Sequence, residues 1–315
     1  MEAVRTLVRH IREEMGKVVV GQDDLKTQCM VTLLCGGHAL LEGVPGIAKT
    51  LAVKTLSHLL RLEFQRVQCT SDLMPADIVG TNVLNMGTSI FQLHRGPVFT
   101  QLLLVDEVNR MPPRTQAALL ECMEERQVTI DGSPHTLSPL FTVFATQNPI
   151  DFEGTYPLPE AQLDRFLAKI RVLYPSAKEE LQLLANVQQG FDAHNLEGAG
   201  LAPIHPELLE QARVEVKAVN VQESLFTYLV QLVRRTREWP ALSLGASPRA
   251  AVSLMMFSKA IAALDGREYL IPDDVKEAVL PVLRHRMVVR PEADLEGISA
   301  DQVLQDILRA VEVPK

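Results

Sequence analysis

The chain has 315 residues, of which 47% are hydrophobic, and it carries a formal net charge of -8 at pH 7 with a pI near 5.6. This length and apolar content predict a folded protein of two domains, and the acidic balance argues against nucleic-acid binding, which needs clustered Lys and Arg. No apolar run approaches the roughly 18 residues that span a bilayer, and the four cysteines lack metal-ligand spacing, so we expect a cytoplasmic protein with reduced thiols and no membrane span.

The N-terminal segment predicts two helices. Positions 4, 7, 8 and 11 are apolar at helical spacing, and the first helix should end at Gly16. This amphipathic pattern is unlike a signal peptide, which has a continuous apolar core. Residues 17–22 then lead into the second helix.

A parallel sheet is predicted between His38 and Leu173, because short β-like runs alternate there with helical stretches. The expected strands are 38–41, 62–69, 102–105, 141–145 and 168–173, with helices on both faces of the sheet. Two hairpins interrupt the alternation. One covers 82–93 with its turn at 86–88, and the other covers 127–137 with its turn at Asp131-Gly132.

Only helical patterns continue after Tyr174, so a domain boundary is expected near Pro175. Residues 1–174 would then form an α/β domain with the two inserted hairpins, and residues 175–315 would form a smaller all-α domain. A loop containing Gly and Pro interrupts the second domain between about Gly190 and Pro206.

A Gly-rich segment follows the first predicted strand and precedes a helical pattern, which is where a phosphate-binding loop must lie. Its residues are Gly43, Val44, Pro45, Gly46, Ile47, Ala48, Lys49 and Thr50. Backbone N–H groups of such a turn cradle phosphates, while Lys49 would reach the β- and γ-phosphates and the Thr50 hydroxyl would bind Mg²⁺. Ala48 departs from the general pattern, which has Gly there. We expect an ATP or GTP site, against the alternative of a Gly-rich turn with an incidental surface lysine.

Two adjacent acids, Asp106 and Glu107, follow the strand predicted at 102–105. Phosphoryl transfer to water needs an acid that holds Mg²⁺ and a base that orients the attacking water, and adjacent carboxylates at a strand tip can do both. We assign Asp106 to Mg²⁺ and Glu107 to the water. The alternative is a strand that merely ends in polar residues.

Three further residues are candidates for contact with the γ-phosphate. Asn148 follows the strand predicted at 141–145, and a neutral amide there can report whether that phosphate is present. Its alternative is a turn-forming Asn before Pro149. Arg165 and Arg249 could stabilise the dispersed negative charge of the transition state, because a guanidinium binds phosphate oxygens in a bidentate manner. Each could instead be a surface arginine or a salt-bridge partner.

Taken together, these segments resemble the MoxR family of AAA+ ATPases, whose members also look like this chain at Ala48. The resemblance extends over nearly the whole chain, through segments 19–22, 42–50, 72–80, 96–99, 106–110, 145–149, 154–166, 244–249 and 283–286. It implies a P-loop AAA+ parallel sheet with helices on both faces, followed by a helical lid. It also implies a homo-oligomeric ring, hexameric in form, with ATP and Mg²⁺ at the subunit interfaces.

The resemblance also implies a role for each candidate residue. Val20 and Gln22 would lie near the adenine. Because inserted hairpins like these can displace the lid, Arg249 could serve its own nucleotide or that of a neighbour. The implied roles are Walker A for Lys49 and Thr50, Walker B for Asp106 and Glu107, sensor 1 for Asn148, arginine finger for Arg165 and sensor 2 for Arg249.

By the same resemblance, the chain would be a chaperone-like ATPase that remodels protein clients. Such proteins help metal-dependent enzymes mature, often with a partner that contains a von Willebrand factor A domain. One alternative is a nucleotide-dependent scaffold with little turnover. Another is a magnesium-chelatase-like or DNA-translocating relative, since these share the hairpin-bearing architecture.

Overall fold

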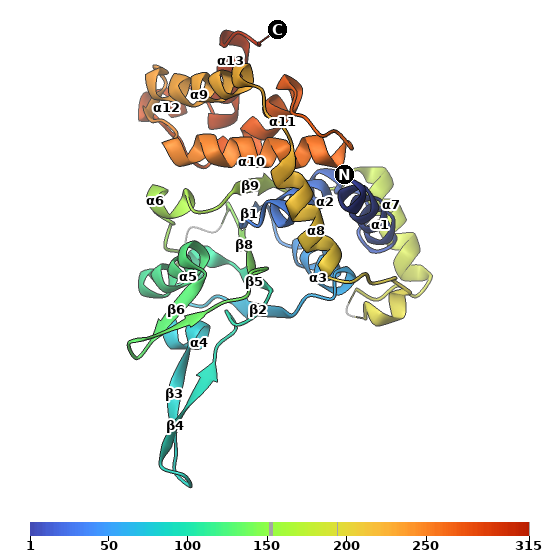
Figure 1. Ribbon diagram of the computed structural model, residues 1–315, viewed down its shortest axis with the longest axis vertical. Helices are drawn as coiled ribbons and strands as arrows, with labels where there is room; N and C mark the ends of the chain where they lie inside the picture. The colour runs from blue at the N-terminus through green and yellow to red at the C-terminus, as the bar shows by residue number, and fades with distance from the viewer. Residues whose placement is uncertain (151–153, 194, 315) are drawn as a thin grey trace.

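The computed structural model describes residues 1–150, 154–193 and 195–314 (Figure 1). A five-stranded parallel sheet lies at its centre in the order β2-β5-β8-β1-β9, which confirms the predicted sheet. Its strands are β1 (Ala39–Glu42), β2 (Phe64–Gln68), β5 (Leu102–Asp106), β8 (Thr142–Gln147) and β9 (Ala168–Arg171).

Alternate residues of the central strands face two separate hydrophobic cores, which is why helices cover both faces of the sheet. Leu41 and Leu104 belong to one core, whereas Leu40 and Leu103 belong to the other. Figure 1 shows α5 on one side of the sheet and α1, α3 and α8 on the other. The helices are α1 (Glu2–Val18), α2 (Asp23–Cys35), α3 (Lys49–Leu59), α4 (Pro75–Val79), α5 (Pro113–Glu125), α6 (Glu160–Leu163), α7 (Ala177–Gln188) and α8 (Glu207–Ala218).

The first helix is longer than predicted, since α1 continues past Gly16 to Val18. Val18 is buried in the core, and this burial favours the extra residues over an end at the glycine. None of the helices within the described residues combines the length and apolar character that a bilayer span requires.

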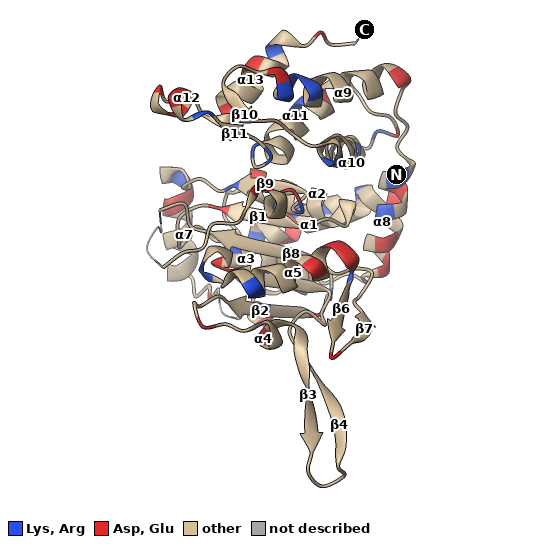
Figure 2. Ribbon diagram, turned by 90° about the vertical axis from the view of Figure 1, so that its left-hand side faces the viewer, with Lys and Arg blue, Asp and Glu red and all other residues tan. Residues whose placement is uncertain are grey.

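Both predicted hairpins are present. β3 (Gly80–Asn85) pairs with β4 (Ile90–Arg95), and β6 (Gln127–Ile130) pairs with β7 (Ser133–Thr136). Asp131 and Gly132 have positive φ angles of 47° and 80°, as a two-residue hairpin turn requires. Figure 2 shows the β3–β4 hairpin projecting away from the rest of the chain.

The second half is mainly helical, but it is not purely so. Contrary to the prediction, β10 (Leu242–Leu244) and β11 (Val288–Val289) form a short antiparallel pair. Strands this short contain too few residues to show a period of two, so the sequence pattern could not reveal them. The remaining helices here are α9 (Glu223–Glu238), α10 (Pro248–Leu264), α11 (Pro272–Leu283), α12 (Pro291–Leu295) and α13 (Ala300–Ala310). Two 3₁₀ turns are also present, η1 (Val108–Arg110) in the first half and η2 (Glu197–Ala199) in the second.

α8 lies against α1, on the α/β part of the chain. The Glu215 carboxylate of α8 accepts hydrogen bonds from the backbone N–H groups of Ala3 and Val4 at 3.1 and 2.9 Å. This places a negative charge at the N-terminal end of α1, where it is stabilising. The domain boundary near Pro175 stays a prediction, and α8, α10 and α11 beyond it all pack on elements of the first half.

Candidate functional site

The loop between β1 and α3 surrounds the N-terminal end of α3. Gly46 and Ala48 have positive φ angles of 82° and 67°, and no described side chain caps α3 at Ala48. Position 43 requires glycine, since a Cβ atom there would lie 2.7 Å from the carbonyl oxygen of Val172. An alanine rarely adopts the left-handed conformation, so the loop holds a strained backbone of the kind found at functional sites. The backbone N–H groups of this helix end can bind an anion such as phosphate.

The ammonium group of Lys49 lies over the same loop. It donates hydrogen bonds to the carbonyl oxygens of Gly43 and Val44, with 2.7 Å between Nζ and the second oxygen. Burial lowers the pKa of Lys49, and the negative charges of Asp106 and Glu107 oppose that shift. The lysine charge is thus next to the N–H groups of the loop, where both attract the same anion.

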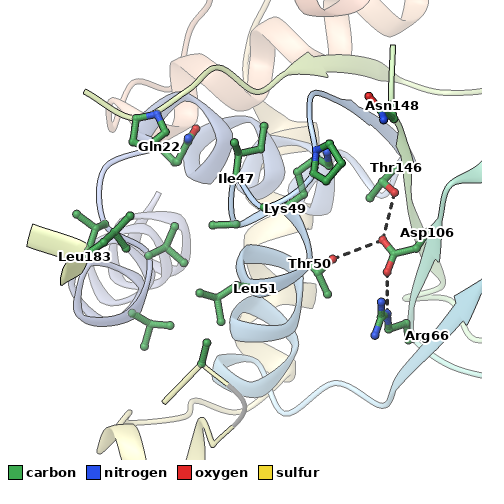
Figure 3. A pocket seen from close by; sticks show the side chains of 18 of the residues that line it. Gln22, Ile47, Lys49, Thr50, Leu51, Arg66, Asp106, Thr146, Asn148 and Leu183 are labelled. Atoms are coloured by element: carbon green, nitrogen blue, oxygen red, sulfur yellow. Dashed lines mark hydrogen bonds and ion pairs between the residues drawn. The ribbon is translucent and has the colours of Figure 1, made fainter. Parts of the chain in front are cut away.

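Asp106, at the end of β5, is the centre of a polar cluster (Figure 3). Its Oδ1 accepts hydrogen bonds from the hydroxyl groups of Thr50, at 3.5 Å, and Thr146, at 3.1 Å. Its Oδ2 accepts one from Nε of Arg66 at 2.7 Å. Asp106 is only 6% exposed, so these partners compensate the burial of its charge. The hydroxyl of Thr50 and the carboxylate of Asp106 are hard oxygen ligands that fit Mg²⁺.

Sequence reasoning gave no role to Arg66 or Thr146. Arg66 comes from β2, whose parallel register places Gln68 opposite Asp106. The sequence holds one signal for the position of Arg66. Arg66 and Gln68 are two residues apart in a strand, so their side chains lie on the same face. Thr146 is the penultimate residue of β8, the neighbour of β5, within a motif in which the sequence pointed only to Asn148.

Glu107 turns away from Asp106 because its backbone is left-handed, with φ 59° and ψ 53°. Its N–H group donates to the Thr146 hydroxyl at 2.9 Å, so one hydroxyl bridges the two adjacent acids. Its carboxylate lies 2.8 Å from Nε of Arg110, one turn further along the chain. The two neighbouring carboxylates therefore face different partners in the same cavity.

Asn148 lies at the edge of that cavity, above Thr146 and Asp106 in Figure 3. Its side-chain oxygen accepts a hydrogen bond from the backbone N–H of Ile150 at 3.3 Å. This is the turn contact that the alternative interpretation expected. It uses only the amide oxygen, so the turn and a donor role for the NH₂ group are compatible.

The other end of the cavity is apolar and suits a flat heterocyclic base. Val20 and Gln22 lie there, as the resemblance implied, and the Gln22 side chain donates to the carbonyl oxygen of Leu173 at 2.8 Å. The opposite wall comes from α7 and the residues on either side of it, which sequence reasoning did not assign to the site. These residues are Pro175, Leu183, Val187, Phe191 and Ala193.

The whole cavity has a volume of about 520 Å³, and it unites most of the predicted binding residues. Gly43 and Val44 are not among its lining residues and instead line a smaller pocket. The predicted residues that line the main cavity are Val20, Gln22, Pro45, Gly46, Ile47, Ala48, Lys49, Thr50, Asp106, Glu107 and Asn148.

Arg165 and Arg249 are not among the residues that line this cavity. Both instead bind Glu124 of α5, with Nη1 of Arg165 at 3.1 Å and Nη2 of Arg249 at 2.5 Å from different carboxylate oxygens. The hydrogen bond from Arg249, and then the charges of both arginines, lower the pKa of Glu124. Figure 1 shows α5 and α6 on the side of the molecule opposite α7. Sequence reasoning missed Glu124, and one chain does not bring its two arginines to its own cavity.

Among the residues that the structure describes, no second cluster of ligating side chains competes with this site for a metal ion. Within the described residues, no group of three or more His, Cys, Asp or Glu side chains is arranged to hold a metal. The four cysteines are free thiols, and burial raises the pKa of Cys35, Cys69 and Cys122 to about 12. A Mg²⁺ ion at Thr50 and Asp106 would therefore need oxygen ligands from water or from phosphate.

Comparison with known proteins identifies the family. The model of the ATPase family associated with various cellular activities (AAA) matches residues 38–168, and that of the AAA lid domain matches residues 234–307. Chaperone MoxR1 of Mycobacterium tuberculosis is 41% identical over 99% of this chain and 83% of its own length. The chain belongs to the MoxR family of AAA+ ATPases.

Other relatives also cover most of the chain. Protein MoxR of Paracoccus denitrificans is 30% identical over 90% of this chain and 89% of its own length. YeaC of Bacillus subtilis, an uncharacterized protein, is 42% identical over 99% of this chain and 97% of its own length. A crystal structure of a protein from Cytophaga hutchinsonii superimposes with a TM-score of 0.90 at 41% identity, covering 99% and 96% of the two chains. The AAA+ α/β fold with a helical lid, predicted from this MoxR resemblance, is thereby confirmed.

Proposed function

We propose that this MoxR-family chain binds ATP with Mg²⁺ in the cavity of about 520 Å³ and hydrolyses it. The observation that carries the proposal is the convergence of Lys49, Thr50, Asp106 and Glu107 on one cavity that also has an apolar end. The polar end fits a triphosphate, and the apolar end, between Val20 and α7, fits adenine with Gln22 beside it.

Each polar residue has a distinct task in that reaction. The N–H groups at the start of α3 and the Lys49 ammonium would bind the phosphates, which requires Lys49 to leave the carbonyl oxygens of Gly43 and Val44. Thr50 and Asp106 would hold Mg²⁺, which neutralises phosphate charge when it is bound. Glu107 would orient the attacking water, and the Asn148 NH₂ group would donate to that water or to the γ-phosphate.

Positive charge for the transition state would come from a neighbouring copy. Arg165 and Arg249 are together at Glu124 and away from their own cavity, so a ring in which each subunit presents this pair to the next completes every site. We propose a hexameric ring of this kind, with Arg165 as the arginine finger. The contact of Arg249 with the same carboxylate supports a role in the neighbour's site.

The target of the ATPase cycle would be a protein. The β3–β4 hairpin carries exposed apolar side chains, with Met86 at 85%, Phe91 at 68% and Ile90 at 66% exposure. Residues 80–93 contain no Lys or Arg, which speaks against a DNA-translocating role for the hairpin (Figure 2). We propose a cytoplasmic chaperone that remodels clients, such as metal-dependent enzymes during maturation, with a von Willebrand factor A domain partner. The relative named Chaperone MoxR1 supports this assignment.

The test is steady-state ATP hydrolysis by the natural protein and by Glu107→Gln. We expect Glu107→Gln to bind a fluorescent ATP analogue normally and to lose about 10²- to 10⁴-fold in turnover, because it cannot activate water. Glu292→Gln, a change at an exposed residue of α12, serves as the control. Equal turnover of the natural protein and Glu107→Gln, with ATP-dependent assembly retained, would instead favour the scaffold function.

A further inference from the structure

Arg286, a buried side chain of the lid, contacts the segment that carries Arg165. This arginine follows α11, its side chain is 2% exposed, and α11 packs against β9 of the central sheet. Figure 1 shows α10 and α11 stacked together at that end of the sheet. The motif 283–286 contributed to the family resemblance, yet the function proposed above gives Arg286 no task.

Arg286 binds four acceptors on the residues that flank Arg165. Its Nε donates to Oδ1 of Asp164 at 2.7 Å, and Nη2 donates to the backbone oxygens of Asp164 and Phe166 at 3.1 and 2.8 Å. Its Nη1 donates to the backbone oxygen of Leu167 at 3.2 Å. One planar guanidinium thus fixes carbonyl groups on both sides of Arg165.

Two further lid residues bind the same segment. His285 contributes a ring nitrogen 2.9 Å from the Phe166 oxygen, which therefore has two partners. The Ser247 hydroxyl, at the start of α10, donates to the Asp164 carboxylate at 3.1 Å. Ser247 is close in sequence to Arg249, so Asp164 connects the segments that carry both arginines.

The fork of donors in Arg286 cannot be replaced by lysine. An ammonium group is a compact point charge, whereas a guanidinium presents five N–H groups in a fixed plane. A lysine could keep the charge opposite Asp164, but it could not reach the carboxylate and three carbonyl groups together. Loss of these contacts would let the backbone around Arg165 shift, and a displacement of a catalytic group by about 1 Å can cost about 100-fold in rate.

We propose that Arg286 is a positioning residue for the arginine finger: it fixes the backbone around Arg165, so that the lid of one subunit sets the finger offered to the next. The inference rests on the proposed function, in which Arg165 acts across a subunit interface. It predicts that loss of the Arg286 contacts impairs the neighbour's site and leaves the subunit's own ATP binding intact.

The experiment measures ATP turnover of Arg286→Lys alone and mixed with Lys49→Ala. The Lys49→Ala subunit cannot use ATP, but its Arg165 and Arg286 are intact. We expect Arg286→Lys alone to lose about 100-fold in turnover while its affinity for a fluorescent ATP analogue changes less than twofold. Mixing with Lys49→Ala should restore turnover, because those subunits then supply well-positioned fingers.

Two controls separate positioning from damage to the lid. Arg267→Lys alters another arginine of the lid, which binds both oxygens of the buried Asp274 at 2.7 and 2.5 Å, and it should leave turnover unchanged. Arg165→Ala, mixed with Lys49→Ala in the same way, reports whether fingers act across the interface. If Arg286→Lys does not fold, Asp164→Asn replaces it. We expect Asp164→Asn to lose about 10-fold in turnover, with recovery on mixing, because the charged partner of Arg286 is removed.

Each outcome decides a different point. Two results would overturn the role of Arg286 and leave the proposed finger across the interface intact. One is rescue of Arg165→Ala without rescue of Arg286→Lys, and the other is turnover of Arg286→Lys within threefold of the natural protein. Failure to rescue Arg165→Ala would overturn the proposed finger across the interface and the role of Arg286 with it. Equal loss in Arg267→Lys would show that general damage to the lid explains the effect.

Discussion

Arg165 and Arg249 bind different oxygens of one carboxylate, that of Glu124. The two arginines come from different parts of the chain, one after α6 and the other at the start of α10. One carboxylate and two guanidinium groups together carry a net positive charge. The guanidinium groups can bind a phosphate group in place of Glu124 only if these ion pairs open.

This arrangement predicts that Arg249 acts on a neighbour's nucleotide. Arg249→Ala alone should lose at least about 10³-fold in turnover if it stabilises the transition state as an arginine finger does. Mixing with Lys49→Ala should restore part of the activity, as measured by phosphate release over a range of ratios. No recovery at any ratio would assign Arg249 to its own subunit. Arg309→Ala, at an exposed ion pair with Asp306, is the control.

Glu124 should compete with the neighbour's ATP for the two arginines. Exposed ion pairs are worth about 0.2–1 kcal/mol each, so removing both should favour assembly by about 1 kcal/mol, or about fivefold in concentration. We expect Glu124→Gln to reach half-maximal ATPase activity at a lower protein concentration than the natural chain. The measurement is turnover against protein concentration at saturating ATP. A higher half-maximal concentration would mean that Glu124 positions the arginines productively.

Arg66 should substitute for the metal charge at Asp106. In Mg²⁺-free buffer, Arg66→Gln leaves a buried carboxylate without its cationic partner, and we expect a loss of about 1 kcal/mol of unfolding free energy. Addition of ATP with Mg²⁺ should reduce the difference, because the ion then supplies positive charge. Thermal unfolding of both proteins with and without Mg²⁺ and ATP measures this. A difference that is the same in all buffers would contradict the idea.

His38 predicts a pH dependence of stability. Its ring is buried between the backbone N–H of Val143, at 2.9 Å, and the carbonyl oxygen of Met123, at 3.0 Å. Burial lowers the pKa of His38 to about 4, with Arg126 and Arg213 acting in the same direction and the bond to Met123 against it. The unfolded chain binds a proton near pH 6.5, so stability should fall as the pH drops from about 6.5 toward 4.

Between pH 7 and 5 this effect of His38 amounts to about 2 kcal/mol. In urea unfolding, the free energy of unfolding of His38→Gln should depend less steeply on pH than that of the natural chain. The difference in slope should correspond to about one bound proton. The exposed His205 provides the matched variant, His205→Gln, which should keep the natural slope. His285, whose pKa burial and the Arg286 charge also lower, continues to contribute in both proteins. If the pH dependence of the unfolding free energy is unchanged in His38→Gln, His38 does not cause it.

The sequence predicted those parts of the site that are formed by a single loop or by the end of a single strand. The phosphate-binding loop, Asp106 and Glu107 could be placed because parallel strands bring their carboxyl ends to one edge of a sheet. Asn148 follows from the same rule, since β8 is next to both β1 and β5, whereas no role was predicted for the neighbouring Thr146. The hairpin turn at Asp131-Gly132 could be predicted for a local reason as well, because both residues tolerate positive φ.

Contacts that depend on how distant elements pack could not be predicted. The ion pair between Arg66 and Asp106 requires β2 and β5 to be neighbours, and Glu124 meets Arg249 only after the lid is placed. The apolar pattern of α7 predicted a helix, but not that Leu183 would line the nucleotide cavity. No period in the sequence carries information about these relationships.

The β3–β4 hairpin has a practical consequence for anyone who handles the purified protein. It is a two-stranded ribbon with an open backbone edge on each strand, and no charged residue interrupts positions 80–93. Natural edge strands usually carry lysine, proline or a bulge that discourages adhesion between molecules. Because the first charged residue of the ribbon is Arg95, at the end of β4, the ribbon should be the first place where concentrated samples aggregate, and Ile90→Lys, at an exposed position of β4, should reduce this aggregation.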